Sequence, residues 1–138
     1  MYVELNHIQK RYGNYQASDD VSFGIEKGKL IGLLGPSGSG KTTILRMIAG
    51  LEHPDSGEIR IDGKVVNDIP ASKRGIGFVF QNYALFRYMT VYDNIAFGLT
   101  LKKEPKDVIE QKVMRMLRLV SLEDYAHRNV TELSGGQQ

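Results

Sequence analysis

The stretch Gly35-Pro36-Ser37-Gly38-Ser39-Gly40-Lys41-Thr42 decides the fold of this chain. It has the spacing G-x-x-x-x-G-K-[ST] of a phosphate-binding loop. The apolar residues 30–34 precede it and residues 43–49 follow it, so a strand, a glycine loop and a helix are expected in this order. An ordinary glycine-rich turn between a strand and a helix is the alternative, but chance rarely produces the whole spacing. The motif therefore predicts that the chain binds a nucleoside triphosphate.

The loop residues are expected to share the work of holding phosphates. The glycines let backbone N–H groups turn inward as a nest, and the helix that begins at Lys41 adds its positive end. Lys41 is placed to reach the β- and γ-phosphates, and the Thr42 hydroxyl to ligate Mg²⁺. The candidate phosphate-binding residues are Gly35, Pro36, Ser37, Gly38, Ser39, Gly40, Lys41, Thr42 and Thr43.

The composition restricts the class of protein. The chain has 138 residues, of which 41% are hydrophobic and 25% charged, as expected for one globular domain. Its apolar runs are only a few residues long, so no membrane-spanning segment or secretory signal is expected. It contains no cysteine, and its net charge of +2 is too small to indicate a nucleic-acid surface.

The first half of the chain has the periodicity of a β-rich layer. Val3, Leu5 and His7 alternate with polar residues, which predicts a half-buried strand. Further strands are expected at residues 21–25, 30–34 and 75–80, with a polar turn at residues 10–14 and a hairpin at Asp62-Gly63. A helix over residues 41–49 is expected to stop at Gly50. These elements predict a mixed sheet around the nucleotide-binding core.

The second half is predicted to be helical. Thr90 begins a capping box, and residues 106–120 form an amphipathic pattern with Ile109, Val113, Met116 and Val120 on one face and Leu117 widening it. Met114 and Met116 are interpreted as core residues rather than a partner-binding surface. A second capping box at Ser121 is expected to open a short helix.

A second motif lies at residues 133–137, Leu133-Ser134-Gly135-Gly136-Gln137. Alone it fits a flexible tail. Together with the phosphate-binding loop about a hundred residues upstream it resembles the signature motif of ABC-type ATPases, and the resemblance extends over the whole chain. It implies an α/β fold, in which about residues 1–81 form a P-loop NTPase core with an antiparallel β layer. About residues 82–138 would form a helical subdomain that carries the signature motif.

The resemblance assigns further residues to ATP and Mg²⁺. Tyr12 lies where the family places the aromatic ring that stacks on adenine, and Gln81 lies where it places the glutamine that senses Mg²⁺ and the γ-phosphate. Thr42 and Gln81 are thus the candidate metal ligands. Taken alone, Tyr12 in a basic turn is more often a half-exposed aromatic than a functional residue, and the phosphate-binding loop reverses that preference. Gln81 alone would carry no information, since a polar residue is expected at the end of a strand.

Within the family, residues 78–99 resemble the ATP-binding subunits of importers, those for sulfate and thiosulfate first and maltose-type sugar importers next. The Phe86-Arg87-Tyr88-Met89-Thr90 segment favours sulfate. The resemblance implies a head-to-tail homodimer, in which residues 133–137 contact the ATP of the partner. It also implies two integral membrane permease subunits, a solute-binding protein and a position at the cytoplasmic face of the membrane. No nucleic-acid partner is expected.

The chain departs from the family where it stops. The family's strand ending in Asp-Glu (Walker B), its D-loop and its switch histidine are not found. Asp19-Asp20 and Glu123-Asp124 do not end apolar strands, and the three histidines lie outside a switch context. We therefore expect a fold truncated before the Walker B strand. No catalytic base is expected in these residues, and ATP hydrolysis would belong to the longer parent protein.

Two other functions use the same loop. A small P-loop kinase for a metabolite would need an acceptor site and a lid, and leaves residues 133–137 unexplained. An ABC-type ATPase acting in repair or translation would have no membrane partner. Co-purification with two integral membrane subunits distinguishes an importer from both.

Overall fold

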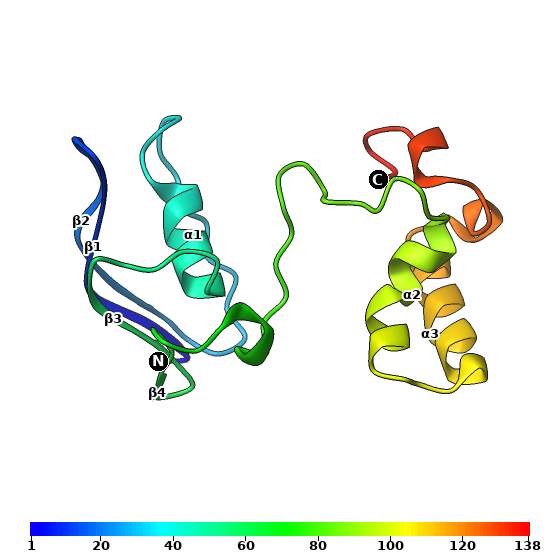
Figure 1. Ribbon diagram of the computed structural model, residues 1–138, viewed down its shortest axis with the longest axis horizontal. Coiled ribbons are helices and arrows are strands. Elements are labelled where there is room, and N and C mark those ends of the chain that lie inside the picture. Colours follow the sequence, from blue (N-terminus) through cyan, green and yellow to red (C-terminus); the bar gives the residue numbers. More distant parts are fainter. The chain divides into compact units, whose positions relative to one another are not determined.

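A computed structural model describes all 138 residues, and the chain divides into two compact units, Met1–Phe78 and Val79–Gln138. Figure 1 shows the first as a sheet with one helix and the second as a group of helices. The units are described separately. The predicted division near residue 81 between a nucleotide-binding core and a helical subdomain stays a prediction.

The first unit contains a four-stranded sheet in the order β2-β1-β3-β4. Its strands are β1 (Val3–Tyr12), β2 (Tyr15–Ile25), β3 (Ser56–Ile61) and β4 (Lys64–Val65). Every neighbouring pair is antiparallel. The antiparallel layer is therefore confirmed, whereas the expected mixed sheet is wrong because no parallel pair is formed.

Two tight hairpins connect these strands. The predicted turn at Asp62-Gly63 is confirmed, and both residues have positive φ, +50° and +73°, as a type I′ turn requires. The predicted polar turn at residues 10–14 is wrong, because β1 continues to Tyr12 and only Gly13 and Asn14 turn the chain. Strand β2 consequently begins at Tyr15, six residues before the predicted start at Val21.

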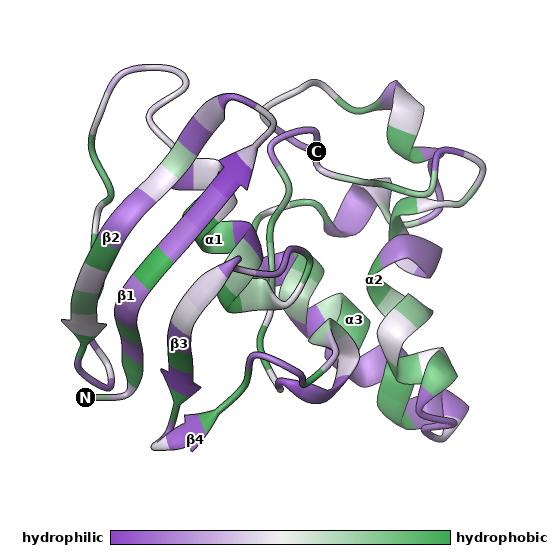
Figure 2. Ribbon diagram, turned by 60° about the vertical axis from the view of Figure 1, so that its left-hand side comes forward, coloured by the Kyte–Doolittle hydropathy of each residue, from purple (hydrophilic) through white to green (hydrophobic).

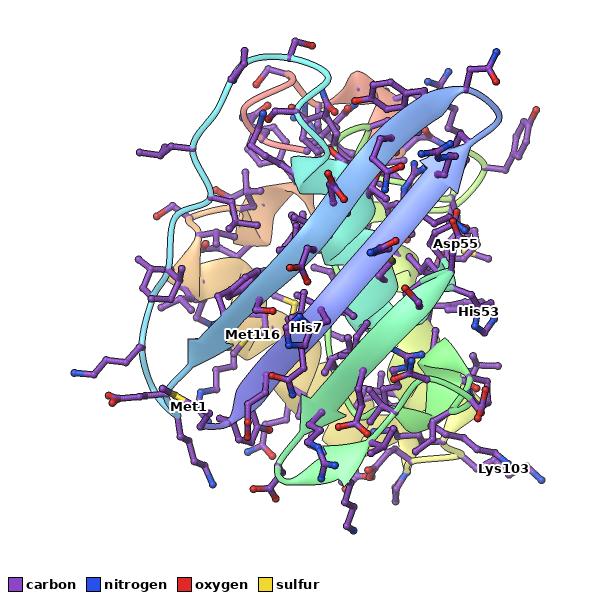
Figure 3. The ribbon with its side chains drawn as sticks, turned by 90° about the vertical axis from the view of Figure 1, so that its left-hand side faces the viewer. Met1, His7, His53, Asp55, Lys103 and Met116 are labelled. Atoms are coloured by element: carbon purple, nitrogen blue, oxygen red, sulfur yellow. The ribbon has the colours of Figure 1, made fainter.

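A bulge interrupts β1 at His7, where φ is +52° and the pairing with both neighbouring strands shifts. Leu5 and Ile8 are buried, and His7 is exposed on the sheet (Figure 3). The predicted inward position of His7 is therefore wrong. Hydrophobic and hydrophilic bands alternate in the first part of β1, and its last residues are hydrophilic (Figure 2). Beyond the bulge, Ile8 and Lys10 are the buried side chains.

Helix α1 (Lys41–Ala49) follows the phosphate-binding loop and ends at Gly50, as predicted. Gly50 has φ +78°, its N–H donates to the Met47 carbonyl, and the Leu51 N–H donates to the Arg46 carbonyl at 2.9 Å. These two bonds form a Schellman motif, which stops the helix. The apolar side of α1 packs on the sheet in a core made of Leu5, Ile8, Ile44, Met47, Ile59, Ile61 and Val66.

The strands predicted at residues 30–34 and 75–80 are not formed. Leu30 and Leu34 are 99% and 96% exposed, although Leu33 and Ile76 pack against the core of the unit. A buried parallel strand needs a hydrogen-bonded strand on each side, and none of β1 to β4 pairs with these segments. Their apolar sequences therefore have the composition of strands, although neither segment is a strand in the structure.

The second unit contains α2 (Val91–Leu101), α3 (Lys106–Leu119) and two short 3₁₀ turns, η2 (Glu123–Tyr125) and η3 (Val130–Glu132). A third 3₁₀ turn, η1 (Ala71–Lys73), belongs to the first unit. Thr90 caps α2, since its side chain accepts a hydrogen bond from the Asp93 N–H at 3.0 Å. The core of the second unit consists of Val91, Ala96, Ile109, Val113, Leu117, Ala126, Val130 and Leu133.

Two predictions in this unit are wrong. Met116 and Val120 are 44% and 59% exposed, because the buried face of α3 runs through Ile109, Val113 and Leu117. Met114, by contrast, does pack against the core. The predicted capping box at Ser121 does not form, and η2 starts after Leu122 without a side-chain cap. No helix is both long and apolar enough to cross a membrane.

Candidate phosphate-binding loop and signature segment

The loop at residues 35–40 lies directly before α1 and is held against β2. Gly40 has φ +83°, and a Cβ atom at this position would lie 2.1 Å from the Ala17 carbonyl oxygen of β2. Gly38 has φ +81°, also in the left-handed region. Only glycine fits the close approach at Gly40, so the packing of the loop on β2 requires the last glycine of the motif.

The helix that follows the loop presents a free N-terminus. No side chain caps α1, and its first turn contains no acidic residue. The first helical hydrogen bond joins the Ile44 N–H to the Gly40 carbonyl at 2.9 Å, so the amides of Lys41, Thr42 and Thr43 have no partner within the helix. Unpaired N–H groups and the helix dipole together attract an anion.

The ammonium of Lys41 is folded over the loop. It donates to the Gly35 and Pro36 carbonyl oxygens at 2.8 and 2.6 Å and to the Ser39 hydroxyl at 3.0 Å. A lysine ammonium has three N–H donors, so all three are used. A phosphate that binds Lys41 must therefore replace some of these bonds, which lowers the net gain from the contact.

Tyr15 contacts the loop, which no motif of the sequence predicted. Its hydroxyl donates to the Gly38 carbonyl oxygen, and its Cα pairs with that of Tyr12 across the β1–β2 hairpin. This bond ties the hairpin to the phosphate-binding loop. The signal that would have revealed it is the two-residue turn Gly13-Asn14, which places the two tyrosines opposite each other.

Tyr12, the predicted adenine platform, is anchored by a charged cluster. The Lys10 ammonium lies 5.2 Å from the centre of the Tyr12 ring and 2.9 Å from the Glu52 carboxylate. Asp55 also approaches Lys10, at 3.3 Å, and accepts a hydrogen bond from the Arg11 N–H at 2.7 Å. Figure 3 shows Asp55 beside the sheet, on the segment that follows α1.

The cluster shifts the pKa values of its members. The hydrogen bond from Lys10 lowers the pKa of Glu52, against the opposing effect of burial, and the same bond raises the pKa of Lys10. Burial raises the pKa of the Tyr12 phenol, and polar contact with Glu52 raises it further. Thr43 of α1 also contacts this phenol. Tyr12 is thus brought next to the helix that carries Lys41 and Thr42.

The lowered pKa of Glu52 predicts a loss of stability in acid. A carboxylate whose pKa is lower in the folded state stabilises the fold above its unfolded pKa, about 4.3, and loses that contribution as the pH falls through the folded value. The Glu52→Gln variant is therefore expected to melt below the unchanged protein at pH 7, with the difference shrinking as the pH approaches 3. Melting temperatures across this range measure the effect. A difference that is constant with pH would contradict the ion pair.

The residues predicted to hold Mg²⁺ lie in different units. The Thr42 hydroxyl is exposed in the first turn of α1, and Gln81 is exposed in a turn of the second unit. No three carboxylate, histidine or cysteine side chains cluster as a metal site. The Thr42 hydroxyl by itself fits Mg²⁺ bound together with a nucleotide, because Mg²⁺ usually takes one or two protein ligands and completes its shell with phosphates and water.

The signature segment forms a turn at the end of the second unit. The Gln137 and Gln138 N–H groups donate to the Ser134 carbonyl at 2.9 and 3.0 Å, and the Ser134 N–H donates to the Gln137 side chain at 3.0 Å. Leu133 is buried, while Ser134, Gly135 and Gly136 are exposed. The turn has the hydrogen bonds of a helix start, with Ser134 at the N-cap position.

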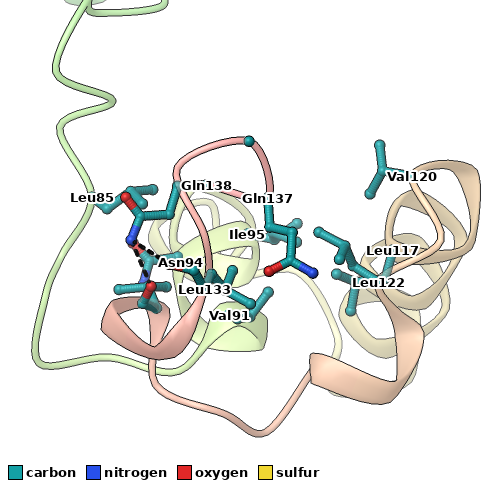
Figure 4. A pocket seen from close by; sticks show the side chains of 12 residues that line it. Leu85, Val91, Asn94, Ile95, Leu117, Val120, Leu122, Leu133, Gln137 and Gln138 are labelled. Carbon is teal, nitrogen blue, oxygen red and sulfur yellow. Dashed lines mark hydrogen bonds between the residues drawn. The ribbon is translucent and has the colours of Figure 1, made fainter.

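This turn borders an apolar cavity of about 400 Å³ within the second unit (Figure 4). Gln138 is fixed at its edge by hydrogen bonds from its side-chain amide to the Val130 and Leu133 carbonyls, at 2.9 and 3.3 Å. The cavity is lined by Leu85, Val91, Asn94, Ile95, Leu117, Val120, Leu122, Val130, Leu133, Gly136, Gln137 and Gln138.

Comparison with known protein families shows to which family the chain belongs. The model of the ABC transporter family matches residues 18–138, which include the phosphate-binding loop and the signature segment. The chain belongs to the ABC transporter family. It is the N-terminal portion of an ABC ATP-binding cassette, so the resemblance drawn from the two motifs is confirmed at the level of the family.

Relatives of this ABC cassette include import ATPases for different solutes. The spermidine/putrescine import ATP-binding protein PotA of Bacteroides thetaiotaomicron is 52% identical over 99% of the chain and 29% of its own length. The sulfate/thiosulfate import ATP-binding protein CysA of Mesostigma viride is 51% identical over the whole chain and 40% of its own length. The chain thus spans between 29% and 40% of these relatives.

Solved structures support the fold. The ATP-binding cassette MJ0796, in a dimeric post-hydrolysis state bound to ADP and Pi, superposes with a TM-score of 0.86 at 31% identity. The match covers 98% of the chain and 64% of that structure. A second dimeric structure, described as a bacterial ABC transporter cassette, gives a TM-score of 0.87 at 31% identity. The predicted P-loop fold with an antiparallel layer and helices is therefore confirmed.

Proposed function

We propose that this ABC cassette is the nucleotide-binding part of an importer subunit that binds ATP and, in its longer parent protein, hydrolyses it. The observation that carries the proposal is the phosphate-binding loop, where an uncapped helix start, Gly40 and Lys41 meet at one point of the first unit. Import ATPases among the relatives, at 51–52% identity, support the transport role.

The residues of the loop have separate roles in this proposal. The backbone N–H groups of residues 37–43 and the Lys41 ammonium bind the phosphates, since Pro36 has no N–H to donate, and the Thr42 hydroxyl and Gln81 hold Mg²⁺. When bound, Mg²⁺ neutralises charge on the phosphate oxygens. The Tyr12 ring stacks on adenine, and its anchored position beside Thr43 supports this role.

The partner of a cassette is a second cassette. The two structures of MJ0796 described above are both dimeric, which supports a homodimer here. Ser134 lies at the N-cap position of an exposed turn, which supports a contact with the γ-phosphate of the partner's ATP where the turn continues as a helix in the longer parent protein. Leu133 anchors that turn in the core of the second unit.

The remaining partners follow from the importer class. Two integral membrane permease subunits and a solute-binding protein would complete the complex, with the cassette attached at the cytoplasmic face of the membrane. The exposed aromatic residues of the second unit support a contact with other subunits, since Tyr88 is 100% exposed and Phe86 44% exposed.

The solute is proposed to be sulfate or thiosulfate, with spermidine and putrescine as the second candidate. The segment 86–90 supports sulfate, and the 52% identical polyamine relative supports the second candidate. Sulfate is an anion and spermidine a cation, yet the sulfate and the spermidine relatives are each about half identical to this chain. Substrate choice therefore belongs to the permease and the solute-binding protein.

Uptake measurements test both transport and solute. We expect deletion of the gene to abolish uptake of labelled sulfate, and the intact gene, but not a Lys41→Ala copy, to restore it. Loss of spermidine uptake with normal sulfate uptake would show that the solute is a polyamine and not sulfate. If uptake of sulfate, spermidine and maltose all stayed normal, the cassette would serve another solute or act without a membrane partner, and co-purification with two integral membrane subunits would distinguish the two.

Residues 1–138 alone are expected not to hydrolyse ATP above background. No Asp-Glu pair follows an apolar strand in this chain, and none of β1 to β4 pairs with the segment 30–34. Nucleotide still has the loop to bind to. Phosphate release by these residues and by the longer parent protein provides the comparison. Turnover equal to that of the parent, and abolished by Lys41→Ala, would show that the catalytic base lies within residues 1–138.

A further inference from the structure

Lys10 is a buried cation with three partners. Its side chain is 11% exposed, and its ammonium lies 2.9 Å from Glu52, 3.3 Å from Asp55 and 5.2 Å from the centre of the Tyr12 ring. A buried charge is tolerated only when it is paired, and here two carboxylates come from the segment that follows α1. The proposed function gives no role to this arrangement.

The geometry places the cation on one side of the Tyr12 ring. A cation within about 6 Å of a ring centre is attracted to the face of the ring. Tyr12 itself is 44% exposed, so the ring also has surface free for another group. Fixed by two carboxylates, the ammonium cannot swing away, and the ring is held between Lys10 and solvent.

Glu52 connects this arrangement to the phosphate-binding helix. It follows the Schellman turn at Gly50 and Leu51 that ends α1, and the phenol of Tyr12 contacts both Glu52 and Thr43. Helix α1 also begins with Lys41 and Thr42. The ring on β1 and the phosphate-binding residues are thus tied to one short helix.

We propose that Lys10, fixed by Glu52 and Asp55, is a positioning residue that holds the Tyr12 ring for a nucleotide base. The inference rests on the proposed function, because it assumes that Tyr12 stacks on adenine. Lys10 does not contact the nucleotide in this scheme. It supports the rear face of the ring, so that the base stacks on a surface already oriented relative to α1 and loses less freedom on binding.

The proposal predicts a selective effect on the base. Calorimetry in the presence of Mg²⁺ would measure the affinity of the protein for ATP and for inorganic tripolyphosphate, which has no base. Lys10→Met keeps the apolar stem but removes the cation, and is expected to reduce the ratio of ATP to tripolyphosphate affinity about three- to tenfold. Lys10→Arg, which keeps the cation, is expected to restore most of the ratio.

The structure offers a matched control and a milder variant. The Lys27 ammonium lies 5.6 Å from the centre of the Tyr2 ring, away from the loop, so Lys27→Met removes a similar contact and should leave the ratio unchanged. Glu52→Gln leaves Lys10 paired with Asp55 and should lower the ratio less than Lys10→Met. It keeps the test informative if Lys10→Met fails to fold.

The outcomes separate this inference from the proposed function. If Tyr12 binds the base, Tyr12→Ala must lower the ratio of ATP to tripolyphosphate affinity. An unchanged ratio in this variant would contradict both the stacking role of Tyr12 and the positioning role of Lys10. If Tyr12→Ala lowers the ratio but Lys10→Met and Glu52→Gln do not, Tyr12 stands and the positioning role is wrong. An equal loss of ATP and tripolyphosphate affinity would mean that Lys10 serves only the fold.

Discussion

Replacing Lys41 with alanine is expected to reduce the affinity for ATP–Mg²⁺ about ten- to a hundredfold, because a charge-assisted hydrogen bond contributes roughly 1.5–3 kcal/mol. The Lys41 ammonium already has three oxygen partners in the loop, at 2.6 to 3.0 Å. Binding exchanges some of these neutral acceptors for phosphate oxygens, so only the difference appears as affinity. The charge of the phosphates decides the sign of that difference.

Titration calorimetry measures this effect, and Lys29→Ala provides the control. Lys29 is an exposed cation shortly before the loop, and its loss removes the same charge without removing a predicted phosphate contact. We expect its affinity for ATP–Mg²⁺ to stay close to that of the unchanged protein. Equal losses in both variants would reduce the role of Lys41 to a general electrostatic attraction.

The Arg74→Ala substitution is expected to have the largest effect on stability, about 3 kcal/mol. Arg74 is 8% exposed, and burial lowers its pKa. Its guanidinium donates to the Met47 and Ile48 carbonyls at 2.8 and 2.9 Å. Two further bonds reach the Ile69 and Asn67 carbonyls at 2.7 and 3.2 Å. The variant leaves these four acceptors and a cavity behind.

The position of Arg74 explains why it matters to the site. Met47 and Ile48 belong to the last turn of α1, where a cation favours the negative end of the helix dipole. Urea unfolding of Arg74→Ala is compared with Arg46→Ala, which removes an exposed arginine from the same turn and should change stability by about 0.5 kcal/mol or less. Similar losses in the two variants would contradict the capping role.

Local chemistry was predictable from the sequence. Gly50 ends α1, Thr90 caps α2, and Asp62-Gly63 turns the β3–β4 hairpin, each for a reason contained in a few neighbouring residues. The phosphate-binding loop belongs to the same class, because its glycines and the helix after it are consecutive in the chain.

The failed predictions depend on partners distant in sequence. Residues 30–34 have the composition of a buried strand, but pairing decides whether a strand forms. The exposure of Met116 depends on which side of α3 faces α2 and the segment around Val130, and not on the spacing alone. Lys10 and Glu52 are 42 positions apart, so no periodicity connects them.

The individual residues of the candidate site could be predicted from the sequence, but the contacts that hold them in place could not. The loop follows from one motif, and Tyr12 and Gln81 were assigned only by resemblance to a family. The contacts that hold Tyr12, from Lys10 and Thr43, and the bond from Tyr15 to the loop required coordinates.

The central claim is that ATP–Mg²⁺ binds at the start of α1, and amide chemical shifts of ¹⁵N-labelled protein test it most directly. Titration with ATP–Mg²⁺ is predicted to shift the amides of residues 37–43 and of Tyr12 most, and titration with tripolyphosphate to shift the loop amides alone. Unchanged loop amides at saturating ATP, or the largest shifts elsewhere in the chain, would contradict the account.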